Sequence, residues 1–213
     1  MTLPIKCTLL LFSFYCFGPL YGQVFDDWEA RPAVAVEHEF NNEIEVKGKF
    51  RHYLRTNSGY FERSSFGIKA DYEYALTTWL APGIDYYYKY NNEQSAHVIR
   101  YSLKANHRWE DSFEIVYSFR LQFSFVSASR PNYYLRNKVE GSYVLAKALS
   151  IFLFAENYQM IHAGLGFYAQ KSGIGAEWEL SDTHELELTF DLKNKSDHQD
   201  IARISLNYTY IIK

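Results

Sequence analysis

Charged side chains at every second position are the residues of this chain that are best placed to do chemistry. Every odd position from 43 to 51 holds Glu, Lys or Arg, whereas residues 44, 46, 48 and 50 are Ile, Val, Gly and Phe. An extended strand places residues two apart on one face, so these charges share a face. A charged surface that encloses water attracts ions of one sign and repels ions of the other. The spacing therefore points first to the selection of ions.

The histidines give less support to catalytic chemistry. A lipid hydrolase that works from a barrel surface needs a serine and a histidine close together on one strand, with a third polar group that orients the histidine. No histidine of this chain is followed by a serine two positions later. We expect no catalytic residue, and we interpret the histidines as interfacial side chains near strand ends. Those that share the parity of the apolar residues are His38, His52, His97, His107 and His184.

Composition excludes several other classes of site. Cys7 and Cys16 are the only cysteines, and both precede the expected mature chain, which leaves no disulfide, thiolate metal site or cysteine nucleophile. We expect no metal site and no cofactor. The formal net charge is -3 and the 22 Lys and Arg residues are spread along the chain, so we expect no nucleic acid as a partner.

The first 22 residues are expected to be a signal peptide. Lys6 provides a positive start, residues 7–17 form an apolar run, and Gly18 and Pro19 end it. The run is too short to span a bilayer as a helix, which argues against the alternative of an uncleaved membrane anchor. We expect cleavage near Gly22, export, and one domain over residues 23–213.

Eleven segments with a period of two follow, and these segments must position the charges. In the last of them, Ile204, Leu206 and Tyr208 alternate with Ser205 and Asn207. Such alternation over roughly 10 to 14 residues, behind a signal peptide, is typical of an antiparallel up-and-down transmembrane β-barrel. Bacterial single-chain barrels have an even number of strands, so we predict an all-β barrel of about 10–12 strands. The segments span 28–40, 43–55, 63–76, 79–90, 96–109, 113–125, 133–145, 149–159, 167–180, 184–193 and 201–213.

The aromatic residues and the connections distinguish a membrane barrel from a soluble barrel or sandwich. A soluble barrel would turn its apolar face inward, and soluble strands are usually shorter. Aromatic residues make up 18% of this chain and gather near segment ends, as in the girdles of outer-membrane barrels. The connections alternate between short, such as 41–42 and 77–78, and longer, such as 56–62 and 194–200. We expect a bacterial outer-membrane location with the longer loops outside, and outer-membrane lipid and lipopolysaccharide as partners.

Several short motifs accompany this pattern. They are Trp28 soon after the leader, Arg120 within a strand, the stretch Tyr-Leu-Arg-Asn-Lys at 134–138, Glu156 after an apolar strand, and the closing tyrosines. Together they resemble a domain-of-unknown-function family of small, uncharacterised outer-membrane β-barrels of Bacteroidota-like, Gram-negative bacteria. One departure is the end at 211–213, Ile-Ile-Lys, where outer-membrane barrels often finish on an aromatic residue. The resemblance implies the fold and the location, and it implies no activity.

The presumed inner face segregates its charges by depth. Basic residues gather toward the long loops and acidic residues toward the short connections, so we expect a lumen that is basic outside and acidic toward the periplasm. Like charges on neighbouring strands repel unless water, ions or opposite charges compensate. For Glu156 we expect a partner in Arg136 or Arg120. The predicted basic belt comprises Arg51, Arg63, Lys69, Arg100, Arg120, Arg136, Lys138 and Arg203, and the predicted acidic set comprises Glu45, Glu73, Glu156, Glu177 and Glu187.

Two functions fit such a lumen. The first is a small, non-catalytic, porin-like pore whose basic outer vestibule favours small anionic solutes. The second is a closed structural or surface-binding barrel, because ion pairs can fill a narrow lumen. An outer-membrane lipid-modifying enzyme is a third interpretation, which the histidines disfavour. The pairs expected in the closed barrel are Lys69–Asp71, Lys138–Glu140 and Asp191–Lys193.

Overall fold

The computed structural model describes residues 27–40, 44–57, 60–90, 94–109, 112–127, 129–161, 166–196 and 200–212, with the backbone alone for 56, 57 and 60–64. The expected signal peptide lies outside these residues, and its cleavage stays a prediction. No helix in the described part of the chain is long and apolar enough to cross a membrane. The described residues form eleven strands: β1 (Asp27–Phe40), β2 (Ile44–Asn57), β3 (Tyr60–Tyr74), β4 (Leu80–Tyr90), β5 (Ser95–Trp109), β6 (Phe113–Val126), β7 (Asn132–Ala146), β8 (Leu149–Met160), β9 (Gly166–Ser181), β10 (His184–Lys195) and β11 (Asp200–Ile212).

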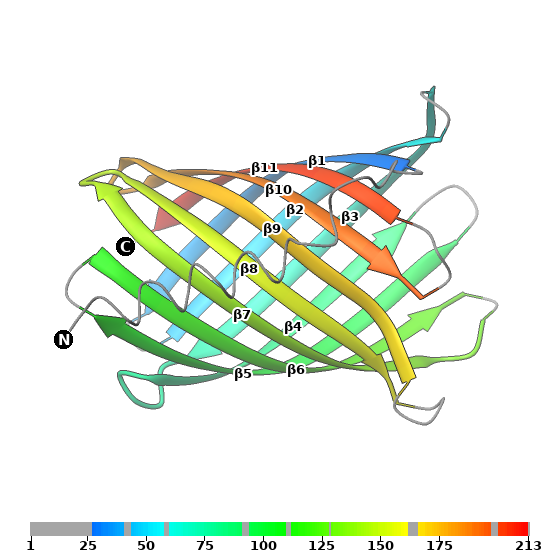
Figure 1. Ribbon diagram of the computed structural model, residues 1–213, viewed down its shortest axis with the longest axis horizontal. Helices are drawn as coiled ribbons and strands as arrows, with labels where there is room; N and C mark the ends of the chain where they lie inside the picture. The colour runs from blue at the N-terminus through cyan, green and yellow to red at the C-terminus, as the bar shows by residue number, and fades with distance from the viewer. Residues whose placement is uncertain are drawn as a thin grey trace, which may run out of the picture.

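The strands close into one barrel in chain order (Figure 1). Strands that follow one another along the chain pair antiparallel. β1 and β11 close the barrel as a parallel pair, with Glu29 opposite Arg203 and His38 opposite Ile212. An odd number of strands leaves the first and last pointing the same way, so this closing pair has to be parallel. The predicted antiparallel up-and-down barrel of about 10–12 strands is confirmed, although the described residues form an odd number of strands where an even number was expected, and the closing pair is parallel.

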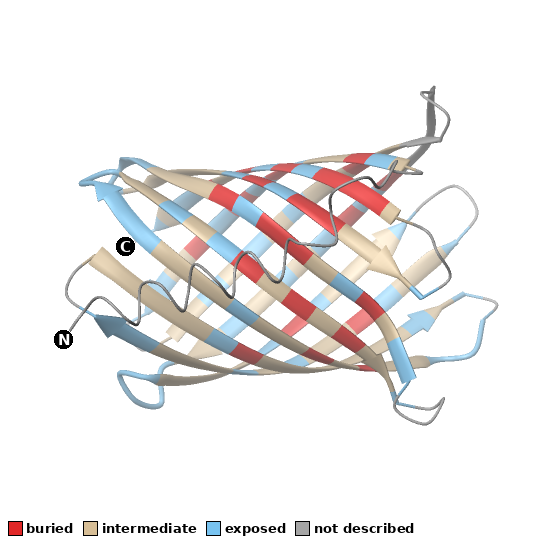
Figure 2. Cartoon of the chain, in the orientation of Figure 1, coloured by how far each residue is buried: buried red, intermediate tan, exposed pale blue. Residues whose placement is uncertain are grey.

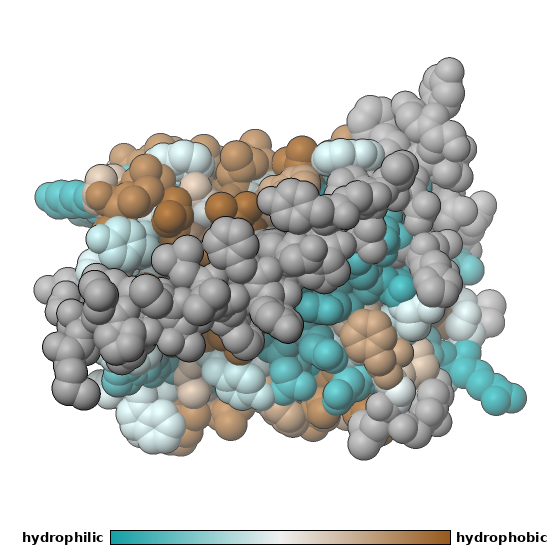
Figure 3. All heavy atoms as spheres, in the orientation of Figure 1, coloured by the Kyte–Doolittle hydropathy of each residue, from teal (hydrophilic) through white to brown (hydrophobic). Residues whose placement is uncertain are grey.

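Side chains alternate between the outer wall and the lumen along each strand, and Figure 2 shows the resulting alternation in burial. On β1, Val34 and Val36 are 53% and 50% exposed, whereas Ala35 between them is 2% exposed. On β11, Leu206 is exposed and Asn207 is buried. Hydrophobic residues gather on the outer wall in Figure 3. The apolar face is therefore the outer one, which is the arrangement of a membrane barrel and the reverse of a soluble barrel.

Each histidine in the described part of the chain lies on the outer wall against an aromatic ring. His97, for example, lies 4.9 Å from the Tyr88 ring, and its Nδ1 is 2.7 Å from the Tyr86 hydroxyl. Ser95 precedes His97 by two residues, but His97 Nδ1 already has the Tyr86 hydroxyl as its hydrogen-bond partner. These contacts fit amphipathic side chains at a membrane interface. The other ring pairs are His38–Phe40, His52–Phe66, His107–Trp109 and His184–Tyr210.

The connections follow the predicted alternation of lengths only in part. β2 continues to Asn57 and β3 begins at Tyr60, because a bulge after Arg55 lets the ladder extend through the expected loop 56–62. Where we expected a turn at 77–78, residues 75–79 separate β3 from β4. We call the end of the barrel at which β1 ends and β2 begins the short-connection end, and the opposite end, at the right of Figure 1, at which β2 ends and β3 begins, the long-loop end.

Candidate functional site

Acidic residues line the lumen at the short-connection end. Directly opposed carboxylates on neighbouring strands repel one another, so this arrangement lowers stability unless cations lie nearby. Two lysines compensate in part: Lys47 Nζ lies 2.5 Å from Glu37 Oε2, and Lys104 pairs with Glu73. The opposed acidic pairs are Glu39–Glu45, Glu45–Glu73, Glu177–Glu187 and Glu179–Glu185.

Basic residues line the lumen from its middle to the long-loop end. Here too the strands place like charges opposite one another, so the segregation inferred from the sequence is present in the ladder itself. Arg63 belongs to this set by its backbone position alone, because its side chain lies outside the described residues. The opposed basic pairs are Lys49–Lys69, Arg55–Arg63, Arg120–Arg136 and Lys171–Lys193.

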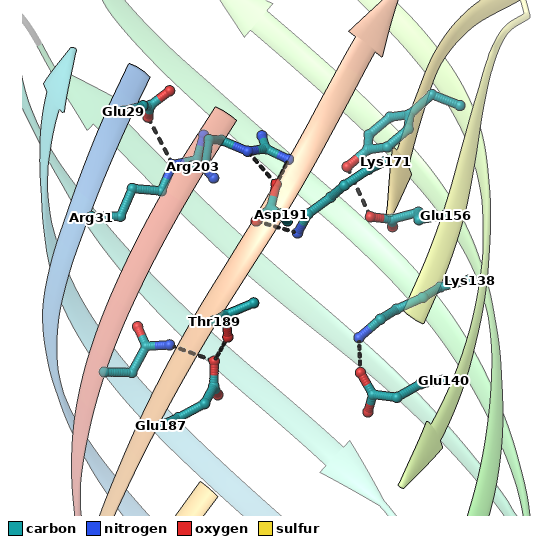
Figure 4. A network of polar contacts seen from close by, with 12 residues as sticks. Glu29, Arg31, Lys138, Glu140, Glu156, Lys171, Glu187, Thr189, Asp191 and Arg203 are labelled. Atoms are coloured by element: carbon teal, nitrogen blue, oxygen red, sulfur yellow. Dashed lines mark hydrogen bonds and ion pairs between the residues drawn. The ribbon is translucent and has the colours of Figure 1, made fainter. Parts of the chain in front are cut away.

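Asp191 on β10 contacts two lumen cations, Arg203 and Lys171, in the centre of the network in Figure 4. Arg203 Nε donates a hydrogen bond to Asp191 Oδ1 at 2.5 Å, and Lys171 Nζ lies 3.4 Å from Oδ2. Asp191 is 1% exposed and Arg203 4%. The expected pair of Asp191 with Lys193 is absent, because Arg203 lies directly opposite Asp191 in the ladder. Lys193 Nζ instead lies 4.9 Å above the Tyr158 ring.

Glu156 on β8 forms the second buried centre. Arg136 donates to Glu156 Oε1 from Nη2 at 2.7 Å and from Nε at 3.1 Å, and the Tyr158 hydroxyl donates to Oε2 at 2.9 Å. Arg120 Nη1 lies 3.4 Å from Oε1. The structure thus brings both expected partners to this carboxylate. A buried acid held by several donors stabilises the cations around it, which would otherwise repel one another.

Further ion pairs lie in the lumen around these two centres. Two pairs expected from the sequence are present: Lys69 with Asp71, and Lys138 Nζ with Glu140 Oε2 at 2.5 Å. Arg100 Nε lies 2.7 Å from Asp85 Oδ1. Of the predicted basic belt, Arg51 and the undescribed Arg63 side chain are left outside these pairs. Of the predicted acidic set, Glu73 and Glu156 are ion-paired, Glu187 accepts hydrogen bonds from Thr189 and Asn207, and Glu45 and Glu177 face other carboxylates.

Four lumen cations have no acid within ion-pair distance among the described residues: Lys49, Arg51, Lys89 and Lys193. Aromatic rings lie against three of them. The ring of Tyr53 contacts Arg51 and Lys89, and the ring of Tyr158 contacts Lys193. No carboxylate whose position the structure describes therefore neutralises their positive charge.

The sequence-based site missed the aromatic residues of the lumen. Phe154 lies beneath two lysines, with Lys138 Nζ 4.8 Å and Lys171 Nζ 4.6 Å from the ring centre. Tyr158 lies 4.4 Å from the Arg136 guanidinium carbon. The sequence did indicate that these rings face the lumen, because Phe154 and Tyr158 share the parity of Glu156, which is the one charged residue of this strand. Apolar residues on both faces of β8 concealed it.

Comparisons with known proteins bear on the fold. No protein-family model and no curated protein matches the chain, so membership of the Bacteroidota-like family stays a prediction. The solved NanC porin matches with a TM-score of 0.54 and 7% sequence identity, over 83% of this chain and 93% of that chain. The KdgM porin in complex with disordered oligogalacturonate matches with a TM-score of 0.49 and 12% identity, over 80% of this chain and 90% of that chain. The similarity to NanC shows that this chain has the fold of a porin barrel.

Proposed function

We propose that this protein is a non-catalytic pore of the bacterial outer membrane that favours small anionic solutes. The observation that carries the proposal is the set of lumen cations that have no acid within ion-pair distance in the described part of the chain, namely Lys49, Arg51, Lys89 and Lys193. Uncompensated fixed charges in a confined, low-dielectric wall raise the local concentration of counter-ions. The carboxylates at the short-connection end form a second barrier of opposite sign, which limits how far anions accumulate. The porin fold supports the same conclusion.

Proteoliposome swelling with three sugars of similar size tests this proposal. Gluconate is anionic, glucose is neutral and glucosamine is cationic, so differences in their uptake report charge and not size. We expect gluconate to enter fastest and glucosamine slowest in liposomes that contain the folded protein. Glucosamine entering faster than gluconate would contradict the proposal.

A closed barrel is the second candidate, and the buried centre of the lumen is the observation that favours it. Asp191 and Arg203 are both buried and ion-paired with each other, and so are Glu156 and Arg136. A folded barrel that lets none of the three sugars enter would support this structural or surface-binding role. Heat-modifiable migration on a gel would show that the silent protein is folded.

Cysteine labelling tests the location and the orientation that we propose. The apolar wall and its aromatic rims suit outer-membrane lipid and lipopolysaccharide. Arg130 at the long-loop end and Lys147 at the short-connection end are both exposed. A membrane-impermeant maleimide should label Arg130→Cys on intact cells and Lys147→Cys only after the outer membrane is permeabilised. The unsubstituted chain serves as the control, and the reverse labelling pattern would invert the orientation.

Substitution of Gly175 tests whether the lumen conducts past β8 and β9. Gly175 faces Phe152, and a Cβ atom there would lie 2.2 Å from the Phe152 ring. The Phe152 ring then has to move away from β9 and further into the lumen. Gly175→Ala should therefore slow the uptake of all three sugars and lower the free energy of unfolding by about 1–3 kcal/mol. Gly48→Ala is the matched control, because the nearest atom to its Cβ is 4.0 Å away on the outer wall. Unchanged uptake in Gly175→Ala would exclude this region from the path.

A further inference from the structure

Three cations converge on a single tyrosine ring between the middle of the lumen and the long-loop end. Lys89 Nζ lies 4.4 Å from the centre of the Tyr53 ring, and the guanidinium carbons of Arg31 and Arg51 lie 5.2 Å and 6.0 Å from it. Arg51 lies two residues from Tyr53 on β2, whereas Lys89 and Arg31 come from β4 and β1 and reach the ring through the pairing of the strands. We call Arg31, Arg51, Tyr53, Tyr87 and Lys89 the Tyr53 cluster.

The wall around Tyr53 is built to hold this ring in place. Tyr53 is 9% exposed and lies directly opposite the buried Ser65 on β3. Gly67 follows on the same face, and a Cβ atom there would lie 2.5 Å from the Tyr87 ring. The missing side chain lets Tyr87 lie over β3, where its hydroxyl donates a hydrogen bond to the Tyr53 hydroxyl at 2.8 Å. The Tyr53 hydroxyl thus keeps its own hydrogen, for which the described residues provide no acceptor.

The charges of the Tyr53 cluster are incompletely matched. Among the described residues, Glu29 is the one acid in contact with it, with its Oε1 2.7 Å from Arg31 Nε. Arg51 donates from Nη2 to Asn207 Oδ1 at 3.0 Å, but its Nε is buried and finds no hydrogen-bond partner in the described part of the chain. One aromatic ring has two faces and attracts a cation weakly, so it cannot offset the mutual repulsion of three. A buried donor and surplus positive charge together call for an anion.

We propose that the Tyr53 cluster is a binding site for one oxyanion, the carboxylate or phosphate group of a solute within the lumen. Arg51 Nε, Lys89 Nζ and the Tyr53 hydroxyl donate hydrogen bonds to the anion, and Tyr87 orients the hydroxyl. The site deepens the proposed pore function and rests on it, because it places one stage of anion passage at named residues. Lys193 lies on β10, two strands from β1 around the barrel, where it contacts the Tyr158 ring and contributes charge to the lumen without touching this site.

Calorimetric titration of the detergent-purified full chain in a chloride-free, low-salt buffer tests the site. Inorganic phosphate and acetate are the two probes, and the one that binds more tightly identifies the preferred oxyanion. We expect one saturable site per chain for at least one probe. Arg51→Gln and Lys89→Gln should each weaken it by at least about tenfold, which corresponds to about 1.4 kcal/mol. Tyr53→Phe keeps the ring and the charge but removes the hydroxyl, and it should weaken binding severalfold.

Lys193→Gln is the matched control, because it removes the same charge from the lumen away from Tyr53, and it should change affinity less than twofold. Absence of saturable binding for both probes would overturn the site, as would affinity that Lys193→Gln lowers as much as Lys89→Gln does. Sugar uptake by the same preparations separates the two proposals. Selective gluconate uptake without binding would contradict the proposed binding site but not the proposed pore. Binding without uptake would contradict the proposed pore but not the binding site.

Discussion

Replacing Glu156 by Gln is expected to lower the free energy of unfolding by about 3 kcal/mol or more. The carboxylate is 3% exposed and accepts two hydrogen bonds from Arg136, with Arg120 at 3.4 Å. Its removal leaves two opposed guanidinium groups without an anion between them. Urea unfolding of the barrel in lipid vesicles, followed by tryptophan fluorescence, measures the loss.

Glu140→Gln provides the matched control for this prediction. Glu140 lies on the neighbouring strand and binds Lys138 at 2.5 Å, but both side chains are more than a fifth exposed to water. Exposed pairs contribute about 0–1 kcal/mol, so we expect a loss within that range. Equal losses for the two variants would show that the Glu156 centre is no more than an ordinary solvated pair.

Replacing Lys49 and Lys193 together by Gln is expected to reduce the preference for anions over cations by at least about fourfold. Neither lysine has an acid within ion-pair distance among the described residues, so each charge acts on the passing ion directly. Two unit charges at about 10 Å change the energy of an ion by about 0.8 kcal/mol in water and by about 3 kcal/mol at an effective dielectric constant of 20. The smaller figure corresponds to the fourfold change. The permeability ratio, obtained from reversal potentials, is the quantity to measure.

Arg130→Gln with Lys147→Gln changes the net charge equally but outside the lumen. Both residues are exposed in connections, where salt screens their charge, and we expect less than about a twofold effect. A shift as large as that of the lumen variant would mean that net charge, and not lumen charge, sets the selectivity. Arg100, Arg120 and Arg136 are poorer choices, because each has an acid in contact and its removal also exposes that acid.

The fold was largely predictable from the sequence, because the two-residue period indicates which side chains share a face of a strand. Residues 203–210 alternate as the sequence indicated, and Ser205, Asn207 and Thr209 are buried in the lumen. The prediction of Arg136 and Arg120 as partners of Glu156 is also confirmed, because the two-residue period places all three side chains on the lumen face. The period does not state how the sheet closes. The parallel seam between β1 and β11, which brings Arg203 beside Glu29, depends on the number of strands and not on any local pattern.

Contacts between lumen residues on different strands could not be predicted from the sequence, because local spacing does not show how the sheet closes. Asp191 pairs with Arg203 instead of Lys193 because the ladder places Arg203 opposite it. Tyr53, Lys89 and Arg31 are separated along the chain and converge only when β1, β2, β3 and β4 curve into one wall. Local spacing therefore identified the charged face, whereas the choice of partners on that face required the closed barrel.

Single-channel recording of the purified protein in a planar bilayer, under a potassium chloride gradient, tests the pore most directly. The steps in current show whether the lumen conducts, and the reversal potential shows which ion carries the current. The uncompensated lumen cations predict steady conductance with a reversal potential displaced toward that of chloride. A reversal potential displaced toward that of potassium, or a folded barrel that carries no current, would contradict an anion-favouring pore.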